Sequence, residues 1–517
     1  MGPWKTIIFA AYALSGHSWA AVVPFIPPAD QENNLVAERD LHNANHIFNA
    51  IHSSMRQWGS SLNHNGMSFF MAQVPAGTQF YHGTGFQQPV EGMEWLAFEP
   101  EHASYFARRL KRPNDTEGSE VKTGDRIQLA PTHDGGMVRQ VPVQEANAKR
   151  PRYEFEPGWL HTYRTKDALP LLYIDGMSAA KAEVGTLDSQ DVLLLNVTRD
   201  ERHGFWDYER ARRLCKLADE NWHGKVKGFI RMEAGFEIIL CSFVENVDIV
   251  SAVRTGPSTP DGDEPDPNDP IRENIMVLIK AISARYDGIG GGRVLLDYNN
   301  FVTSYAYDLE LFNNGGDLPR LENLSVASLD KVRNDVDAMV TNWEPSDSNT
   351  VNWQSIADMV VERYANELQY LVSDMLITPQ AFFYELSTVL RVFIDSDNRN
   401  STTEVERCVN QFVPTRINSS ASIAGRAIDA VTRRICSSLF AAFDGNVSVS
   451  ESKANLRSLM TYLDWTTWKK CGDCALDEVC FIPVWPYGAE EDRRHPRCRN
   501  ATEIGWRQGG WQWSYWI

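Results

Sequence analysis

The sequence predicts an α+β N-terminal domain with split antiparallel sheets and helices, then a mainly α-helical domain and a small disulfide-stapled C-terminal cap. Short, aromatic-rich apolar runs bounded by turn residues alternate with helical patterns up to about residue 255. From residue 328 to residue 462, apolar residues recur almost throughout at helical spacing. Residues 464–517 hold half of the cysteines and seven tryptophans, which favours a small stapled unit.

Changes in composition set the expected boundaries between these parts. Residues 256–270 are acidic and rich in Pro, Asp and Gly, which is typical of a linker or a long surface loop. The expected parts are a signal peptide over 1–21, the α+β domain over 22–255, the acidic Pro-rich linker or loop over 256–272, the helical domain over 273–463 and the cap over 464–517.

The individual elements follow from hydrophobic periodicity. Apolar residues at Ile47, Ile51, Met55 and Trp58 predict one helix near the start of the α+β domain. Strands are expected within 66–84 and over 94–98, 159–164, 169–176, 229–231 and 236–243. Helices are expected near 207–222, 275–282, 329–340, 356–371, 379–394, 403–412, 423–440 and 453–463.

The N-terminal residues predict a secreted protein. Residues 1–5 are basic, residues 7–14 are apolar, and residues 18–21 offer small side chains for cleavage, which together are typical of a signal peptide. That apolar stretch is too short to span a bilayer, and no later run of about 18 apolar residues follows. Asn-X-Ser/Thr sequences agree with secretion and predict glycosylation at Asn114, Asn196, Asn323, Asn400, Asn418, Asn446 and Asn500.

The eight cysteines, an even number, suit an oxidising compartment. We expect no free thiol, with Cys408 bonded to Cys436 and the last four cysteines paired among themselves. Cys471-X-X-Cys474 is also a spacing found in zinc and redox sites. The later spacing fits no common zinc module, so disulfides are favoured and no metal site is predicted.

The net charge of −18, from 68 acidic and 50 basic residues, repels nucleic acid and anionic membranes. Neither is therefore expected as a general partner. Two basic runs, residues 108–112 and 149–152, are interpreted as solvated loops, with a phosphate contact as the alternative.

Residues 77–107 carry the candidate chemistry. Tyr81-His82-Gly83-Thr84 ends the first of two predicted strands, and the second contains Trp95-Leu96-Ala97. A helix that carries Tyr105 is predicted to begin at Glu99-Pro100-Glu101. Aromatic rings can hold a flat cationic ring, and a histidine can fix a hydroxyl, so these residue types suit a ligand with both groups.

These motifs resemble the ADP-ribosyltransferase fold of the His-Tyr-Glu branch, which includes the poly-ADP-ribose polymerases and diphtheria-type toxins. In that branch a His-Gly ends the first strand, a tyrosine lies in a Tyr-Phe-Ala-like strand, and a second tyrosine lies on the adjoining helix. A glutamate then opens a late apolar strand, here residues 235–241 with Glu237. Trp95 stands where the family has its first tyrosine, and His102 where a nicotinamide-binding serine is usual.

The resemblance implies that NAD is the substrate, either for ADP-ribose transfer or for simple hydrolysis. It implies that His82 holds the adenosine ribose and that Gly83 contacts the nicotinamide amide. Trp95 and Tyr105 would then sandwich the nicotinamide ring.

Two acids are candidates for the catalytic role that the resemblance implies. Glu237 would steady the ribosyl cation as nicotinamide leaves, because a carboxylate beside a developing positive charge stabilises the transition state more than the ground state. Glu233 lies in the same region and is the alternative catalytic acid. A turn at residues 178–181 is expected to lie against this site.

Other interpretations stay open. In a purely structural one, Trp95 and Tyr105 are core residues, His82 is a satisfied turn histidine and Glu237 is a strand-edge acid. A second keeps the fold without the activity and gives a secreted binding protein. A third is a secreted carbohydrate-binding or carbohydrate-active protein, although no pair of carboxylates stands out as acid and nucleophile. The signal, sequons and cysteines together resemble those of secreted proteins of filamentous fungi, many of which have no assigned activity.

Overall fold

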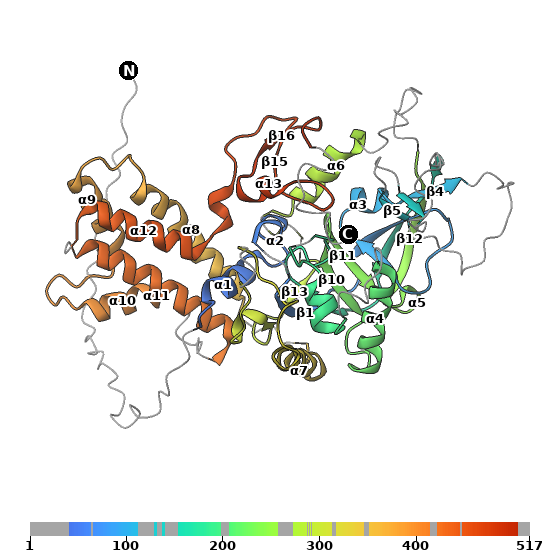
Figure 1. Ribbon diagram of the computed structural model, residues 1–517, viewed down its shortest axis with the longest axis horizontal. Helices are drawn as coiled ribbons and strands as arrows, with labels where there is room; N and C mark the ends of the chain where they lie inside the picture. Colours follow the sequence, from blue (N-terminus) through green and yellow to red (C-terminus); the bar gives the residue numbers. More distant parts are fainter. Residues whose placement is uncertain are drawn as a thin grey trace, which may run out of the picture. The chain divides into compact units, whose positions relative to one another are not determined.

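The fold is taken from a computed structural model (Figure 1). It describes residues 41–63, 66–111, 129–131, 137–139, 154–182, 184–197, 206–256, 272–286, 288, 290, 292–312, 317–345, 351–413, 421–444 and 447–504. The expected signal peptide and nearly all of the expected linker lie outside these residues. So do the basic run at 149–152 and the sequons at Asn114, Asn418 and Asn446.

A ten-stranded sheet forms the centre of the α+β region, in the order β12-β8-β2-β3-β11-β10-β9-β1-β13, with β14 paired to β1. Its strands are β1 (Ser68–Val74), β2 (Gln79–Thr84), β3 (Glu94–Ala97), β8 (Trp159–Thr165), β9 (Leu169–Ile174), β10 (Gly228–Met232), β11 (Phe236–Leu240), β12 (Val247–Arg254), β13 (Leu295–Leu296) and β14 (Val302–Thr303). Neighbours are antiparallel except β9 and β10. β13 and β14 come from beyond residue 255, where the sequence places the end of this domain.

The sheet is almost divided between β2 and β3. These two strands share one residue pair, Tyr81 opposite Ala97, whereas β2 pairs with β8 along its whole length from Gln79 to Thr84. Every residue of β10 and β11 is buried, as expected for apolar central strands covered on both faces. The predicted α+β class with split, mainly antiparallel strands is confirmed.

Short helices and turns cover this sheet. They are α1 (Ala44–Ser53), α2 (Gln57–Asn63), α3 (Pro100–Ser104), the π-helix η3 (Ser189–Leu194), α4 (Asp207–Glu220), α5 (Phe243–Asn246), α6 (Arg272–Ser283) and the 3-10 turn η5 (Ser304–Ala306). The single helix predicted over residues 47–58 is instead two helices, because the chain turns at Met55, whose φ of 54° is left-handed. Three small two-stranded sheets pair β4 (Arg108–Lys111) with β7 (Glu154–Pro157), β5 (Leu129–Pro131) with β6 (Met137–Arg139), and β15 (Val479–Phe481) with β16 (Arg497–Arg499).

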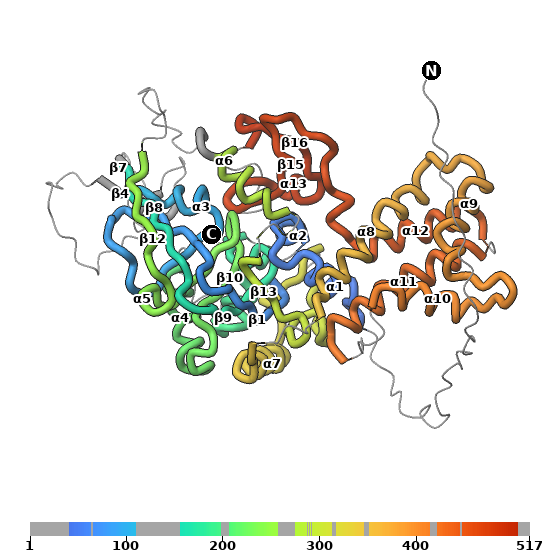
Figure 2. Tube along the Cα trace, turned by 180° about the vertical axis from the view of Figure 1, so that it is seen from behind, coloured from blue at the N-terminus to red at the C-terminus, as the bar shows by residue number. Residues whose placement is uncertain are grey.

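The mainly helical region predicted after the sheet is confirmed. Its helices are α7 (Val326–Asn342), α8 (Trp353–Val372), α9 (Pro379–Leu390), α10 (Ser401–Val409), α11 (Ile423–Phe443) and α12 (Val449–Leu463). Each begins after a Ser, Thr or Asn whose side chain accepts a hydrogen bond from the first turn. Helix α1 lies beside α8 and α11, and its Asn45 and Asn49 donate to the carbonyls of Tyr462 and Leu463 (Figure 2).

All eight cysteines are paired, as predicted. Cys408–Cys436 joins α10 to α11, and the last four pair as Cys471–Cys480 and Cys474–Cys498. The remaining bond, Cys215–Cys241, ties α4 to the end of β11. The cap contains the 3-10 turn η7 (Thr466–Lys469), β15, α13 (Glu490–Arg494) and β16, and its apolar residues pack on α2 and α6. No helix in the described part of the chain has the length and hydropathy needed to cross a bilayer.

Candidate functional site

Strands β2, β3 and β11 are neighbours in the sheet, and they carry His82, Trp95 and Glu237 respectively. Across these strands, Ala97 faces both Tyr81 and Glu237. Directly opposed residues share a face of the sheet, and alternate residues of one strand do as well. Trp95 and Glu237 therefore lie on one face. Since Ile239 is the partner of Trp95, Glu237 is its diagonal neighbour, about 7–8 Å away between Cα atoms.

The alternation along β2 places His82 on the opposite face from Tyr81 and Glu237. The Nδ1 atom of His82 lies 2.8 Å from the carbonyl oxygen of Trp95. Its ring packs against Phe243, with 5.8 Å between centroids. The structure thus brings His82 to the backbone of Trp95, where it fastens β2 to β3 at the split, and not to the carboxylate of Glu237.

Helix α3 covers Gly83. A Cβ atom on Gly83 would lie 1.9 Å from the carbonyl oxygen of Ala103, so only glycine allows α3 to pack this closely on β2. The space beside Gly83 that a Cβ atom would fill is therefore occupied by helix backbone.

Tyr105 and His102 lie at the other side of α3. The guanidinium of Arg108 stands 4.6 Å from the centre of the Tyr105 ring, and that ring packs on the cluster that α6 forms with the cap. Burial raises the pKa of Tyr105, while Arg108 and a hydrogen bond with Tyr487 oppose this shift. His102 is buried beside the β10–β11 turn, and burial lowers its pKa to about 4, so its ring is neutral near pH 7.

Glu237 is held by the arginine that faces it on β10. Arg231 Nε donates to Glu237 Oε1 over 2.8 Å, and Arg231 NH1 donates to Gln190 on η3 over 3.1 Å. Arg231 is 1% exposed and Glu237 is 7% exposed. No residue described by the structure donates a hydrogen bond to Oε2 of Glu237, so one carboxylate oxygen is fixed and the other is available.

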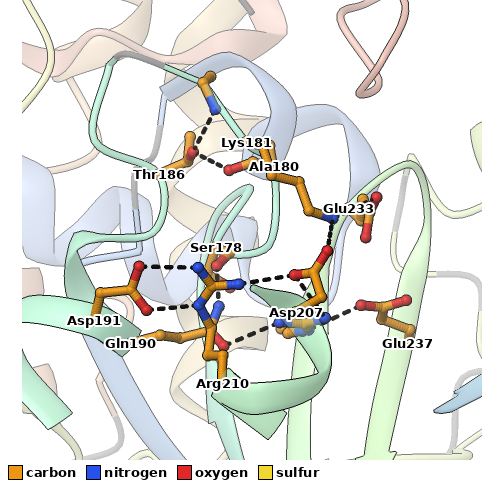
Figure 3. A network of polar contacts seen from close by, with 12 residues as sticks. Ser178, Ala180, Lys181, Thr186, Gln190, Asp191, Asp207, Arg210, Glu233 and Glu237 are labelled. Carbon is orange, nitrogen blue, oxygen red and sulfur yellow. Dashed lines mark hydrogen bonds and ion pairs between the residues drawn. The ribbon is translucent and has the colours of Figure 1, made fainter. Parts of the chain in front are cut away.

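Glu233, the alternative acid, is bound by Lys181. Lys181 Nζ lies 2.6 Å from Glu233 and 3.0 Å from Asp207 at the start of α4 (Figure 3). The turn predicted at residues 178–181 therefore does contact the site. Burial raises the pKa of Glu233, and the carboxylates of Glu237 and Asp207 add to this, against the charge of Lys181.

Asp207 links these two ion pairs to helix α4. Burial disfavours its charge, but Lys181, Arg210 and Arg231 outweigh burial and lower the pKa of Asp207. Arg210 also binds Asp191 on η3 through two bonds of 2.6 and 3.0 Å, and neither side chain is exposed. Such a bidentate pair fixes the orientation of both elements.

The network alternates basic and acidic side chains. Its basic groups are Lys181, Arg210 and Arg231, and its acidic groups are Asp191, Asp207, Glu233 and Glu237. A buried carboxylate of such a network can stabilise a developing positive charge that comes close to it.

The structure adds one aromatic residue to the site. Tyr208, on the first turn of α4, has its ring centroid 6.4 Å from that of Trp95. The sequence indicates Tyr208 only as one apolar position of a helix, and no local pattern shows that this residue lies beside Trp95 of β3. A hollow of about 360 Å³ lies nearby at the start of β2, lined by Gln79, Tyr81 and Arg293 among others, but no candidate catalytic or binding residue lines it.

One family model and two yeast proteins are similar to parts of this chain. A family model described as the YPL277C N-terminal domain matches residues 29–274, which include every candidate residue. Uncharacterized protein YOR389W of Saccharomyces cerevisiae is 31% identical over 251 residues, covering 44% of this chain and 36% of the relative. Uncharacterized protein YPL277C of the same yeast is 32% identical over 246 residues, covering 44% and 46%. The chain therefore spans less than half of the length of these curated relatives. No solved structure matches it.

Proposed function

We propose that the α+β region cleaves NAD between nicotinamide and ribose and passes the ADP-ribosyl group to water or to an acceptor, with Glu237 as the catalytic carboxylate. The observation that carries the proposal is the order of β2, β3 and β11. These neighbouring strands carry His82, Trp95 and Glu237 at the point where the sheet splits, with Trp95 and Glu237 on one face and His82 on the other. The order of the motifs along the chain, a His-Gly, an aromatic strand, an aromatic helix and a late strand with a glutamate, is what the resemblance to the His-Tyr-Glu ADP-ribosyltransferases implies.

The proposed reaction needs one negative group near the breaking bond. The bond between C1′ of the ribose and the nicotinamide nitrogen breaks, its electron pair leaves with nicotinamide, and positive charge develops on the ribose. Oε2 of Glu237, to which no described residue donates a hydrogen bond, would face that charge while Arg231 holds Oε1 in place. Water then adds to C1′ and releases a proton to solvent, which gives ADP-ribose. The carboxylate acts mainly in the transition state, because only there is the ribose fully cationic.

The other candidate residues have different roles in this proposal. Trp95 offers a half-buried aromatic face on the same side of the sheet as Glu237. His82 lies on the other side and is assigned to the adenosine ribose, where its ring is oriented by the Trp95 carbonyl. Gly83 and Tyr105 are engaged by α3 and by the cap, respectively, and receive no direct role.

A secreted binding protein that keeps the fold without the activity is the second candidate. It is favoured by one observation, that both candidate acids are already ion-paired, Glu237 with Arg231 and Glu233 with Lys181. For the carbohydrate alternative, Trp465 and Trp485 in the cap are buried and offer no sugar-stacking face. Secretion itself remains part of the proposal, and the four disulfides agree with it.

The proposal is tested with the mature protein, its disulfides intact. Calorimetric titration with NAD measures binding, and chromatography of the reaction mixture measures released nicotinamide. We expect both saturable binding and slow release of nicotinamide. Binding without release would favour the second candidate, and neither binding nor release at millimolar NAD would show that the proposal is wrong.

A further inference from the structure

The last four cysteines of the chain, the cap cysteines, meet at one place. Cys480 on β15 and Cys498 on β16 face each other directly in the antiparallel pair, which places their Cβ atoms about 4.5–5.5 Å apart. Each is bonded to a cysteine of the loop before β15, Cys480 to Cys471 and Cys498 to Cys474. The pairing of β15 with β16 thus creates a cluster that the spacing along the chain does not reveal.

The sulfur atoms of the two disulfides lie close to one another across the bonded pairs. The Sγ atoms of Cys471, Cys474 and Cys498 are all within 4.8 Å of one another, and the Sγ atom of Cys480 is bonded to the first of them. Zinc holds four thiolates in a tetrahedron with bonds of about 2.3 Å, which separates the sulfur atoms by about 3.8 Å. The three sulfur atoms therefore need to approach by about 1 Å at most, while the bonded atoms move apart when the disulfides open.

Contacts that do not involve the disulfides hold this part of the cap. The Tyr286 hydroxyl donates to the carbonyl oxygen of Cys480 over 2.7 Å, and Lys280 Nζ donates to the carbonyl oxygen of Leu476 over 2.6 Å. Phe481, which follows Cys480, is 1% exposed in the apolar cluster that the cap forms with α2 and α6. These contacts would keep the cap cysteines near one another after the disulfides are opened.

The loop that carries Cys471 and Cys474 suits a metal ion. Residues 470–478 form neither helix nor strand, and a Cβ atom on Gly472 would meet no atom within 4 Å beyond its chain neighbours, so this backbone has room to adjust. The Cys471 amide donates to the Sγ atom of Cys480 over 3.1 Å, and such a bond favours a thiolate over a thiol. All four cap cysteines are partly exposed, so a reductant and a metal ion can reach them.

We propose that the cap cysteines bind one Zn²⁺ ion as a tetrathiolate once the two cap disulfides are reduced. A dithiol supplies two electrons and two protons to each disulfide and is itself oxidised to a disulfide. The four thiols that result lose their protons to water as Zn²⁺ binds the thiolates. Sulfur ligands in a tetrahedron select zinc over harder cations such as magnesium and calcium. Reoxidation would re-form the disulfides and release the ion, so the cap would hold zinc only under reducing conditions. This site is separate from the proposed NAD site and does not depend on it.

The experiment compares the whole protein before and after reduction with a phosphine, which competes for zinc less than a dithiol does. Without oxygen, the reduced protein is titrated with zinc chloride against a chromophoric chelator, and with cobalt chloride in parallel. We expect one zinc ion per chain after reduction and no such binding before it, with cobalt giving the absorption bands of a tetrahedral thiolate site. Cys474→Ser should weaken zinc binding at least about a hundredfold, and Cys474→His should retain it, because histidine is a zinc ligand but cannot form a disulfide.

A double replacement outside the cap is the matched control. Cys215→Ser combined with Cys241→Ser removes a disulfide of the α+β region, leaves the cap cysteines intact and should bind zinc as the wild type does after reduction. Near-ultraviolet circular dichroism of the reduced, zinc-treated proteins checks that each is folded. A reduced wild-type protein that binds no zinc at micromolar concentrations, or that unfolds in the presence of zinc, would overturn the proposal. Zinc binding that is unchanged in Cys474→Ser would overturn it as well.

Discussion

Replacing Asp191 by asparagine tests how firmly α4, which carries Tyr208, is fixed to the rest of the site. Asp191 on η3 and Arg210 on α4 are fully buried and share two hydrogen bonds of 2.6 and 3.0 Å. Asparagine keeps the shape and loses the charge, which leaves Asp207 as the remaining acidic partner of Arg210. Removing one partner of a buried ion pair costs about 3–5 kcal/mol when the other charge is left uncompensated, and because Asp207 still compensates part of the Arg210 charge we expect a loss near the lower end of this range.

The loss should appear in native-state hydrogen exchange of the α4 backbone. A difference of about 1.4 kcal/mol is tenfold in an equilibrium constant, so protection of these amides should fall roughly 100-fold or more where α4 opens locally. Arg212→Met on the exposed face of α4 is the control and should leave protection unchanged. Protection of α4 in Asp191→Asn that stays within about tenfold of wild type would refute the reasoning.

Three further predictions concern stability and binding. Burial raises the pKa of Asp175 to about 7 in the folded protein, whereas its pKa in the unfolded chain is about 4. The protonated carboxyl is therefore favoured by folding, and the stability of the folded state falls as the pH rises from about 4 to about 7. Asp175→Asn can keep the acceptor for the Ser68 amide, so its thermal unfolding midpoint should exceed that of wild type at about pH 8 and match it at about pH 4. Gly83→Ala should lower the free energy of unfolding by about 1–3 kcal/mol or more in thermal denaturation, because its Cβ would meet the Ala103 carbonyl at 1.9 Å; an unchanged midpoint would contradict the packing of α3. His82→Ala should weaken NAD binding in calorimetric titration, and an unchanged dissociation constant would remove His82 from the site.

Local patterns in the sequence are sufficient to predict the class of fold and the pairing of Cys408 with Cys436. Helical spacing and capping residues such as Ser325 and Asn352 mark the helices after the sheet, because both signals act within one or two turns. The bond between Cys408 and Cys436 follows from their places on two adjacent predicted helices. The break at Met55 was missed, since the apolar spacing continues across a turn that only the left-handed backbone of that residue reveals.

The candidate site could be predicted only in part, because its chemistry depends on register and on distant partners. Periodicity indicates that β2 and β11 are strands, but the pairing of Tyr81 and Glu237 with Ala97 is needed to see that His82 faces the other way. The arginine opposite Glu237 and the position of Tyr208 beside Trp95 also depend on long-range packing. No spacing along the chain encodes such contacts.

The most direct test of the central claim is the effect of Glu237→Gln on NAD cleavage. Glutamine keeps the shape of the side chain and removes the charge that faces the ribosyl cation, so nicotinamide release should fall at least about a hundredfold. NAD affinity should change little, because that charge matters mainly in the transition state. Glu245→Gln on α5, an exposed acid outside the network, is the matched control and should retain wild-type turnover. A Glu237→Gln protein that releases nicotinamide at the wild-type rate would contradict the assignment of Glu237 as the catalytic carboxylate.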